Sequence, residues 1–506
     1  MTPTGGSRPT GDHDPAEGEQ HLELMLEEID LVVEPESTAL APAVGIAVAG
    51  GPLIPLPHDE ETHLQRHQGD SLRSGLTAAG PVAVAGLVVN GASALVVVLV
   101  ARLVTPQDYG VIAQLLGLFF ILSMPGSAVL VGVVRRVTTW QKLGQGYRVH
   151  DWVARVHRLA LAGIAVEAVV VWFLRDWISR ELSLPNADGV VLILVAAGIW
   201  ILLSVDRGLL QANRDYRGLA ANLLIEGGVR TVCVIGFVVA GMGVTGYALG
   251  IFLSEVVATG HARWLARNAW PAPDPAEVHD AGTRTPPEPD HPVTGQIVRR
   301  DLLLDVSAAF VGLAMLGLLQ NVDVIILGRL SPSHTGAYAA ISVASKALVF
   351  GALALGTYLL PEATIRWNEG GHAVRQLAVT LVFLAVPAVV LLGIAVFIPS
   401  WFLTLVFGAK LATAAPAFAP LVGAMIFLCL TVLMTNYLFG VGRRWIVLVL
   451  LAGSGLAVLL IAGAHGSPVG TARADLVVQG ALALAITVAF VWIHHKEHRA
   501  RWLRRR

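Results

Sequence analysis

Several charged side chains stand deep inside long apolar segments of this sequence, where they could bind an ion or a polar ligand. Lys346 follows a turn that contains Pro332 and Gly336, and twelve residues separate it from His334. At roughly 1.5 Å per residue, a helix of that length descends about 18 Å, which reaches the middle of a bilayer. A charge there costs about 2.5 to 3.5 kcal/mol, so such a side chain is expected to face protein or a wet cavity.

Lys346 and Arg230 are the candidates for binding an anion. A fixed cation in a low-dielectric cleft attracts a diphosphate strongly, because the attraction is poorly screened there. Arg230 has an alternative role, since Glu226 stands four residues before it in the favourable order for an ion pair on one helix face. Lys346 has no acid within one turn, so its partner must come from another helix, with Glu255 and Glu167 as candidates, or from a ligand.

Amide side chains at similar depth could hydrogen-bond sugar hydroxyls. They are Asn90, Gln320 and Asn321. The latter two lie about one helical turn nearer the outside than Lys346, and Asp323 is closer still to the surface. Hydrogen bonding between helices explains these amides equally well.

Carboxyl groups near the bilayer centre are candidates for binding a coupling proton or sodium ion. Glu255, Glu167 and Glu226 are the three candidates, because burial disfavours the charged form of an unpaired carboxyl. We find no nucleophile motif, phosphate-binding loop or zinc-ligand spacing, so we expect neither catalytic residues nor a metal site nor a cofactor. His494, His495 and His498 lack supporting Cys or carboxylate ligands.

The elements that carry these residues are predicted to be membrane-spanning helices. Apolar residues make up 55% of the chain and charged residues 14%, and the apolar residues occur in long blocks. Twelve blocks are long enough to cross a hydrocarbon layer of roughly 30 Å. They lie near residues 78–101, 110–134, 156–174, 189–210, 218–240, 244–264, 302–328, 334–360, 376–398, 414–438, 445–464 and 475–493.

The distribution of Lys and Arg predicts the orientation of these spans. If the N-terminus is cytoplasmic, the inside segments hold 26 Lys and Arg residues and the outside loops hold 6. We therefore expect both termini in the cytoplasm and the protein in the cytoplasmic membrane. The alternation also supports the number of spans, because losing one span would reverse every later loop.

The two halves of the chain contain a repeat. The first outer loop reads RLVTPQDYG from Arg102, and the connection between spans seven and eight reads RLSPSHTGAY from Arg329. Because each half has an even number of spans, the halves must be related by an axis along the membrane normal. The sequence thus predicts an all-α membrane protein with two six-helix lobes around a central cleft. We expect these boundaries: a tail at 1–75, lobes at 76–266 and 301–494, a linker at 267–300, and a basic tail at 495–506.

The first 75 residues differ from the rest in charge. Residues 1–70 hold fourteen acids against Arg8 and Arg66, a composition that predicts a mostly disordered cytoplasmic tail. Within it, residues 21–33 repeat apolar residues at helical spacing and could dock a partner or form a transient helix.

The sequence resembles the Wzx-type flippases of the multidrug/oligosaccharidyl-lipid/polysaccharide exporter superfamily. The matching segments are the quoted repeat and NVDVIILGRL, TYLLPEATIR, FGAKLATAAPAFAPL and NYLFGVGRRW. The resemblance covers about residues 78–494. It implies alternating access by two six-helix lobes that move an undecaprenyl-pyrophosphate-linked glycan outward. The related lipid II flippases usually have fourteen spans, so twelve spans argue against that family.

Other functions stay open from the sequence. A cation-coupled exporter of small amphiphiles would share the fold and use the midplane acids, and a membrane scaffold would use the acidic tail to dock cell-envelope enzymes. A glycan polymerase is disfavoured because every predicted outer loop is short. The expected partners are a lipid-linked glycan, membrane lipids and envelope-polysaccharide enzymes, and no nucleic acid.

Overall fold

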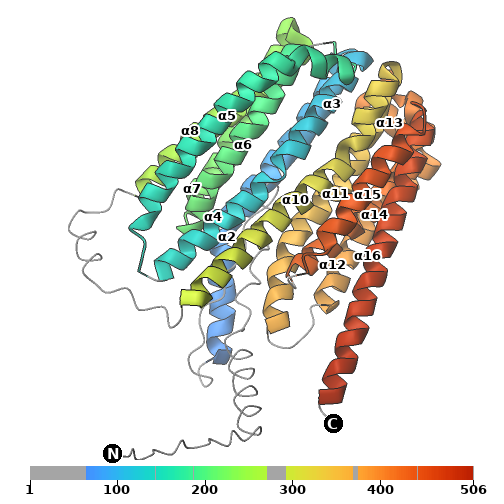
Figure 1. The fold of residues 1–506 in the computed structure, drawn as a ribbon. Coiled ribbons are helices and arrows are strands. Elements are labelled where there is room, and N and C mark those ends of the chain that lie inside the picture. Colours follow the sequence, from blue (N-terminus) through green and yellow to red (C-terminus); the bar gives the residue numbers. More distant parts are fainter. Residues whose placement is uncertain are drawn as a thin grey trace, which may run out of the picture.

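The computed structural model describes residues 64–142, 144–185, 187–270, 292–368, 374–440 and 443–504, and these residues form helices joined by short turns (Figure 1). The helices of the first half are α2 (Leu64–Leu103), α3 (Pro106–Ser123), α4 (Gly126–Lys142), α5 (Arg148–Glu181), α6 (Ala187–Ala212), α7 (Tyr216–Phe237), η2 (Val238–Met242) and α8 (Gly243–Ala269). Those of the second half are α10 (Pro292–Leu330), α11 (Pro332–Asn368), α12 (Val374–Phe397), α13 (Pro399–Phe407), η3 (Ala409–Ala417), α14 (Phe418–Gly440), α15 (Ile446–Ala462) and α16 (Pro468–Arg504).

The helices confirm the predicted all-α membrane fold. Within the described ranges, ten helical stretches are long and apolar enough to cross a membrane. One of them, Tyr216–Ala269, has 54 residues and is interrupted at Gly241 and Gly243, whose φ angles are 85° and 50°. Glycine tolerates these positive φ angles, so the chain turns there and α7 and α8 are separate crossings. With the shorter apolar helix Ile446–Ala462, the described chain contains all twelve predicted spans.

The second span is one crossing built from two helices. α3 ends at Ser123 and α4 begins at Gly126, with Pro125 between them. Proline lacks an N–H group and clashes with the preceding turn, which explains the break.

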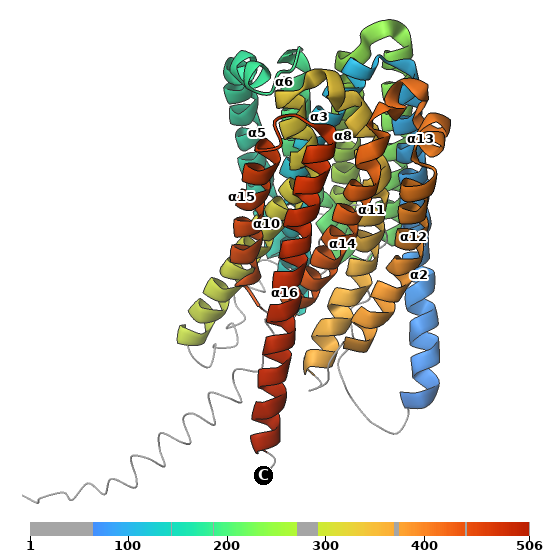
Figure 2. The ribbon, with the colours of Figure 1, turned by 90° about the vertical axis from the view of Figure 1, so that its right-hand side faces the viewer.

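The helix packing repeats between the two halves. In the first half α2 packs on α7, α4 on α6, α5 on α6, α6 on α8, and α7 on α8. In the second half the corresponding pairs are α10 with α15, α11 with α14, α12 with α14, α14 with α16, and α15 with α16. The same five pairings in the same order make α2–α8 one lobe and α10–α16 the other. Figure 2 shows the second lobe from its outer side, with α16 in front.

The lobes meet where the two copies of the repeated connection come together. α3 packs on both α10 and α11. A Cβ atom added to Gly110 would lie 2.8 Å from the backbone nitrogen of Gly336, and one added to Gly336 would lie 1.8 Å from the carbonyl oxygen of Pro106. Both positions therefore need glycine, because any side chain would prevent this approach of the two backbones. Deeper along the same contact, the rings of Phe120 and Phe350 are 6.1 Å apart.

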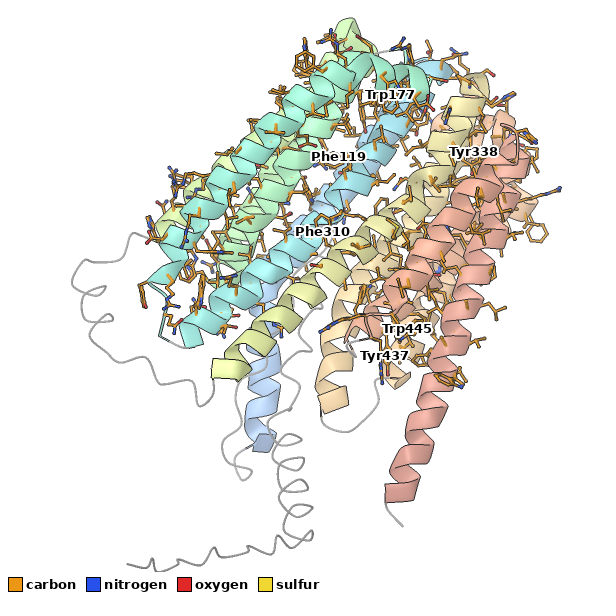
Figure 3. All side chains as sticks on the ribbon, in the orientation of Figure 1. Phe119, Trp177, Phe310, Tyr338, Tyr437 and Trp445 are labelled. Atoms are coloured by element: carbon orange, nitrogen blue, oxygen red, sulfur yellow. The ribbon has the colours of Figure 1, made fainter. Side chains whose placement is uncertain are left out.

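Side chains exposed outside the lobes are largely apolar. Phe173 and Trp177 on α5 are 79% and 57% exposed, and Phe397 on α12 is 84% exposed. This is the composition of a surface that contacts lipid rather than water. Figure 3 shows Trp177 toward the end of the molecule at which the lobes meet, and Tyr437 and Trp445 toward the opposite end.

The helix ends can be set beside the expected division into tails, lobes and linker. α2 begins at Leu64, α8 ends at Ala269, α10 begins at Pro292 and α16 ends at Arg504. The expected domain boundaries at 75, 266, 300 and 494 stay predictions. The predicted amphipathic helix at 21–33 lies outside the described residues.

Candidate functional site

A buried four-charge cluster, formed by Arg207, Glu226, Arg230 and Glu255, lies in the first lobe. The predicted ion pair between Arg230 and Glu226 on α7 is confirmed. The Arg230 guanidinium also donates to Oε1 of Glu255 on α8, at 2.7 Å, and Arg207 on α6 donates to Oε2 of Glu226 at 2.5 Å. Two cations and two carboxylates thus balance, as burial of charges requires.

The amide of Asn222 ties this cluster to the backbone of α8. Its oxygen accepts a hydrogen bond from Nε of Arg207 at 2.8 Å, and its nitrogen donates to the carbonyl oxygen of Ala258 at 2.8 Å. The same nitrogen lies 3.3 Å from Nδ1 of His261. Asn222 and Glu226 are one turn apart on α7, so one face of this helix is polar and buried.

Next to the four-charge cluster, Asp206 joins three helices toward the end of the molecule where the chain termini lie. Its Oδ2 is 2.9 Å from Nε2 of His157 on α5, and its Oδ1 is 3.4 Å from Nη1 of Arg263 on α8. Asp206 is completely buried. A carboxylate that contacts a histidine on α5 and an arginine on α8 connects α5, α6 and α8.

Sequence reasoning missed Asp206, Arg207 and Asn222. The predicted span ended near residue 210, and Arg207 was counted with the following loop, whereas α6 continues to Ala212 with both charges buried. The available signal was an Asp–Arg pair that directly continues an apolar block.

The second lobe contains a separate buried cluster around Lys346. Its Nζ donates to Oδ1 of Asn321 at 3.2 Å and lies 3.6 Å from Oδ1 of Asp323. The protein partner of Lys346 is therefore Asp323 on α10, and not Glu255 or Glu167, the two acids that were candidates from the sequence. α11 begins at the end where the lobes meet, and its side chains tilt back toward that end, so the long lysine side chain reaches Asp323.

Two further polar residues on α16 complete this cluster. Gln479 donates from Nε2 to Oδ1 of Asp475 and to the carbonyl oxygen of Leu319 on α10, both at 3.1 Å. Ser342 on α11 lies 3.4 Å from Oδ2 of Asp323. Asp323, Asp475 and Gln479 are all completely buried. Sequence reasoning missed Asp475, because the first residues of the last span were assigned to a loop or to the edge of the span.

The remaining candidates are more scattered. Gln320 is buried on α10 next to Asn321, and Asn90 is half-buried on α2. Glu167 on α5 lies against Gly198 on α6, where an added Cβ atom would come within 2.1 Å of its carboxylate oxygen. The structure places Glu226, Arg230 and Glu255 in a cluster of the first lobe and Asn321 and Lys346 in a cluster of the second, instead of gathering all candidates at one site.

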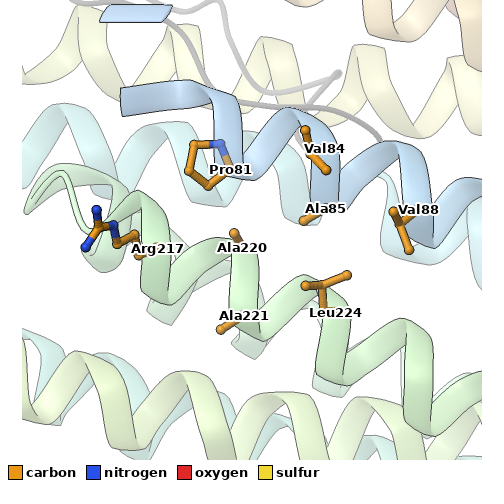
Figure 4. A pocket seen from close by; sticks show the side chains of 8 residues that line it. All are labelled: Pro81, Val84, Ala85, Val88, Arg217, Ala220, Ala221 and Leu224. Atoms are coloured by element: carbon orange, nitrogen blue, oxygen red, sulfur yellow. The ribbon is translucent and has the colours of Figure 1, made fainter. Parts of the chain in front are cut away.

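A shallow groove of about 540 Å³ lies on the outside of the first lobe, between α2 and α7 (Figure 4). Its lining is apolar except for Arg217 and consists of Pro81, Val84, Ala85, Val88, Arg217, Ala220, Ala221 and Leu224. Val84 and Val88 are more than half exposed, which fits a surface covered by lipid chains.

Solved structures share this arrangement of helices. An inward-facing MATE family multidrug-resistance transporter of the MOP superfamily matches with a TM-score of 0.57 and 12% sequence identity, over 79% of this chain and 99% of its own. The lipid II flippase MurJ, in an inward closed conformation, matches with a TM-score of 0.55 and 11% identity, over 80% of this chain and 86% of its own. The chain has the fold of MOP superfamily transporters.

The crystal structure of a MATE mutant gives a similar match, with a TM-score of 0.53 and 14% identity over 81% of this chain and 94% of its own. No family model and no curated protein sequence matches the chain. The shared fold includes both a multidrug-resistance transporter and a lipid flippase, so it leaves the cargo open.

Proposed function

We propose that this chain is an alternating-access transporter that flips a polyprenyl-pyrophosphate-linked oligosaccharide across the cytoplasmic membrane. One observation carries the transport part of the proposal: two lobes of the MOP transporter fold are joined at one end by contacts that the repeat duplicates. Arg102 of the first lobe donates to the carbonyl oxygens of Leu405 and Val406 in the second. Arg329 of the second lobe pairs with Glu181 in the first.

These contacts fit a gate. They join exposed residues at helix ends, and exposed ion pairs contribute only about 0.2 to 1 kcal/mol each. Such contacts stabilise the conformation in which the lobes are joined at this end, but only weakly, so the end can still open. The excess of Lys and Arg in alternate loops supports cytoplasmic termini, which places the joined end outside and makes this conformation closed to the outside.

The charge clusters suggest how an anionic headgroup would be recognised. Lys346 is already engaged by Asn321 and Asp323, so a diphosphate would have to displace an acid to reach it. Arg230 is also engaged, by Glu226 and Glu255, but its side chain is 22% exposed whereas that of Lys346 is 9% exposed. We therefore assign the headgroup contact to Arg230 in preference to Lys346, with Asn90, Gln320 and Asn321 as candidates for sugar contact.

A cation-coupled exporter of small amphiphiles is the second candidate function. The match to a MATE multidrug-resistance transporter and the buried carboxylates of both lobes favour it. In that case Glu255 or Glu226 would take part in ion coupling, and Glu255→Gln would abolish export.

Depletion of the protein from its host tests the flippase proposal. The expected result is accumulation of one lipid-linked saccharide on the cytoplasmic side of the membrane, identified by mass spectrometry of extracted lipids. Unchanged lipid-linked saccharides together with raised sensitivity to amphiphilic drugs would reject flipping in favour of drug export.

A further inference from the structure

The cluster in the second lobe has more buried acids than cations. Asp323 and Asp475 are both completely buried, and Asp475 is within electrostatic range of both Asp323 and Lys346. Asp323 precedes the end of α10 by seven residues and Asp475 follows the start of α16 by seven, so both lie about 10 Å below the same face. With Lys346 as the one nearby cation among the described residues, full ionisation leaves one uncompensated negative charge.

The cations at this end of the lobe do not face the two acids: Lys410 on η3, Arg473 on α16 and Arg329 on α10 are exposed, and Arg329 pairs with Glu181. α14 packs against α11 and α16, α15 packs against α10 and α16, and neither has an Asp, Glu, Lys, Arg or His residue in its described range. The phenol of Tyr338 on α11 faces the two acids and is uncharged. An uncompensated buried charge costs several kcal/mol, so a further positive charge must enter when both acids are buried.

Lys346 already takes the position that a metal ion would need. Its ammonium group lies between an amide oxygen and a carboxylate oxygen, the ligand types that hard cations prefer. Asp475 is left with Gln479 as its hydrogen-bond partner, and its Oδ2 atom is buried without a partner in the described structure. One proton on this carboxyl group would neutralise the charge that Lys346 leaves uncompensated.

We propose that Asp323, Asp475 and Lys346 form a proton-binding site, in which Lys346 is a tethered cation and Asp475 carries one proton while the outer end is closed. The proposal rests on the transport function above for its role in coupling, but the proton site itself exists independently of the cargo. Ion coupling is then assigned to Asp475 and not to Glu226 or Glu255, because Arg207 and Arg230 already balance the charges of those two residues.

The tethered cation also explains why a lysine stands at this depth. Removal of the ammonium group by Lys346→Ala would leave Asn321, Asp323 and Asp475 facing a vacated space with no fixed positive charge. A sodium ion could then enter the space, because two carboxylates and an amide supply its preferred oxygen ligands. Sodium is therefore expected to leave the thermal stability of the natural chain unchanged and to stabilise the Lys346→Ala variant.

Infrared difference spectroscopy of the purified full-length protein tests the site directly. We expect a band from one protonated carboxyl group at neutral pH, lost in Asp475→Asn and retained in Asp188→Asn, a matched change of an exposed acid. Gln479→Leu, which removes the hydrogen bond to Asp475, should shift the band even if Asp475→Asn fails to fold. Absence of any such band, or a band insensitive to both Asp475→Asn and Gln479→Leu, would overturn the proposal.

Thermal unfolding in sodium or choline chloride gives the second measurement. The natural protein should unfold at the same temperature in both salts, and Lys346→Ala should unfold at a higher temperature in sodium. Sodium stabilisation of the natural protein would overturn the tethered-cation role. Because neither measurement requires a cargo, a confirmed proton site without saccharide accumulation would reject the flippase function and leave the site in place.

Discussion

Arg102 and Arg329 occupy the first position of the two repeated connections, and each contacts the opposite lobe. Arg102 binds the last carbonyl groups of α13, which follows the third span of the second lobe. Arg329 pairs with Glu181 at the end of α5, the third span of the first lobe. The twofold relation between the lobes thus extends from the backbone to two side chains at the joined end.

The pair Arg329–Glu181 should control how often this end opens. Arg329→Glu places two acids together and is expected to raise the open population several-fold, as loss of about 1 kcal/mol predicts. Distances between spin labels at Asp188 and Ser333 would report the change. The double variant Glu181→Arg, Arg329→Glu restores opposite charges and should return the natural distance distribution, whereas an unchanged distribution in the single variant would show that the pair is no gate.

The close approach of α3 and α11 requires glycine at two positions. Gly336→Ala should destabilise the protein by about 1 to 3 kcal/mol through overpacking against Pro106, and Gly110→Ala should do the same against Gly336. Gly228→Ala is the matched control, because an added Cβ atom there meets nothing within 4 Å. Detergent-based thermal unfolding is the measurement, and equal stability of all three variants would argue against the observed contact.

Within the four-charge cluster, Glu226 should be more important for stability than Glu255. Glu226 accepts from both Arg207 and Arg230, whereas Glu255 accepts only from Arg230 among the hydrogen bonds described. Loss of one partner from a buried ion pair costs about 3 to 5 kcal/mol, so Glu226→Gln should lower the unfolding temperature more than Glu255→Gln. The reverse order would assign Glu255 a structural role that its contacts do not explain.

The acidic N-terminal segment should be dispensable for transport. Deletion of residues 1–63 removes no part of α2 and is expected to leave glycan export unchanged. Cell-surface polysaccharide measured in the deletion strain would test this expectation. Loss of export by this deletion, with normal amounts of protein in the membrane, would favour the scaffold function.

Much of the fold could be predicted from the sequence because each span is encoded locally. Apolar run length and the alternation of Lys and Arg between loops predicted all twelve crossings, and the repeat predicted the two lobes. The ion pair of Arg230 with Glu226 was also predictable, since four residues on a helix fix the geometry.

The sites were harder to predict, because they depend on how each helix is rotated and on where it ends. Lys346 and Asp475 are 129 residues apart in sequence, and neither depth nor periodicity indicates that α11 and α16 turn these residues toward Asp323. Asp206 and Arg207 lie inside the predicted span 189–210, but Arg207 was counted with the following loop, because charged residues near the end of an apolar block are hard to assign to helix or loop from sequence.

Flipping by the purified protein in vesicles tests the central claim most directly. The lipid-linked saccharide that accumulates on depletion would be placed in both leaflets, and a glycosidase added outside would measure transfer between them. We expect vesicles with the natural protein to expose nearly all of the saccharide to the enzyme, and Arg230→Ala vesicles to expose only about the outer half, as protein-free vesicles do. Equal exposure with and without the protein would contradict the central claim.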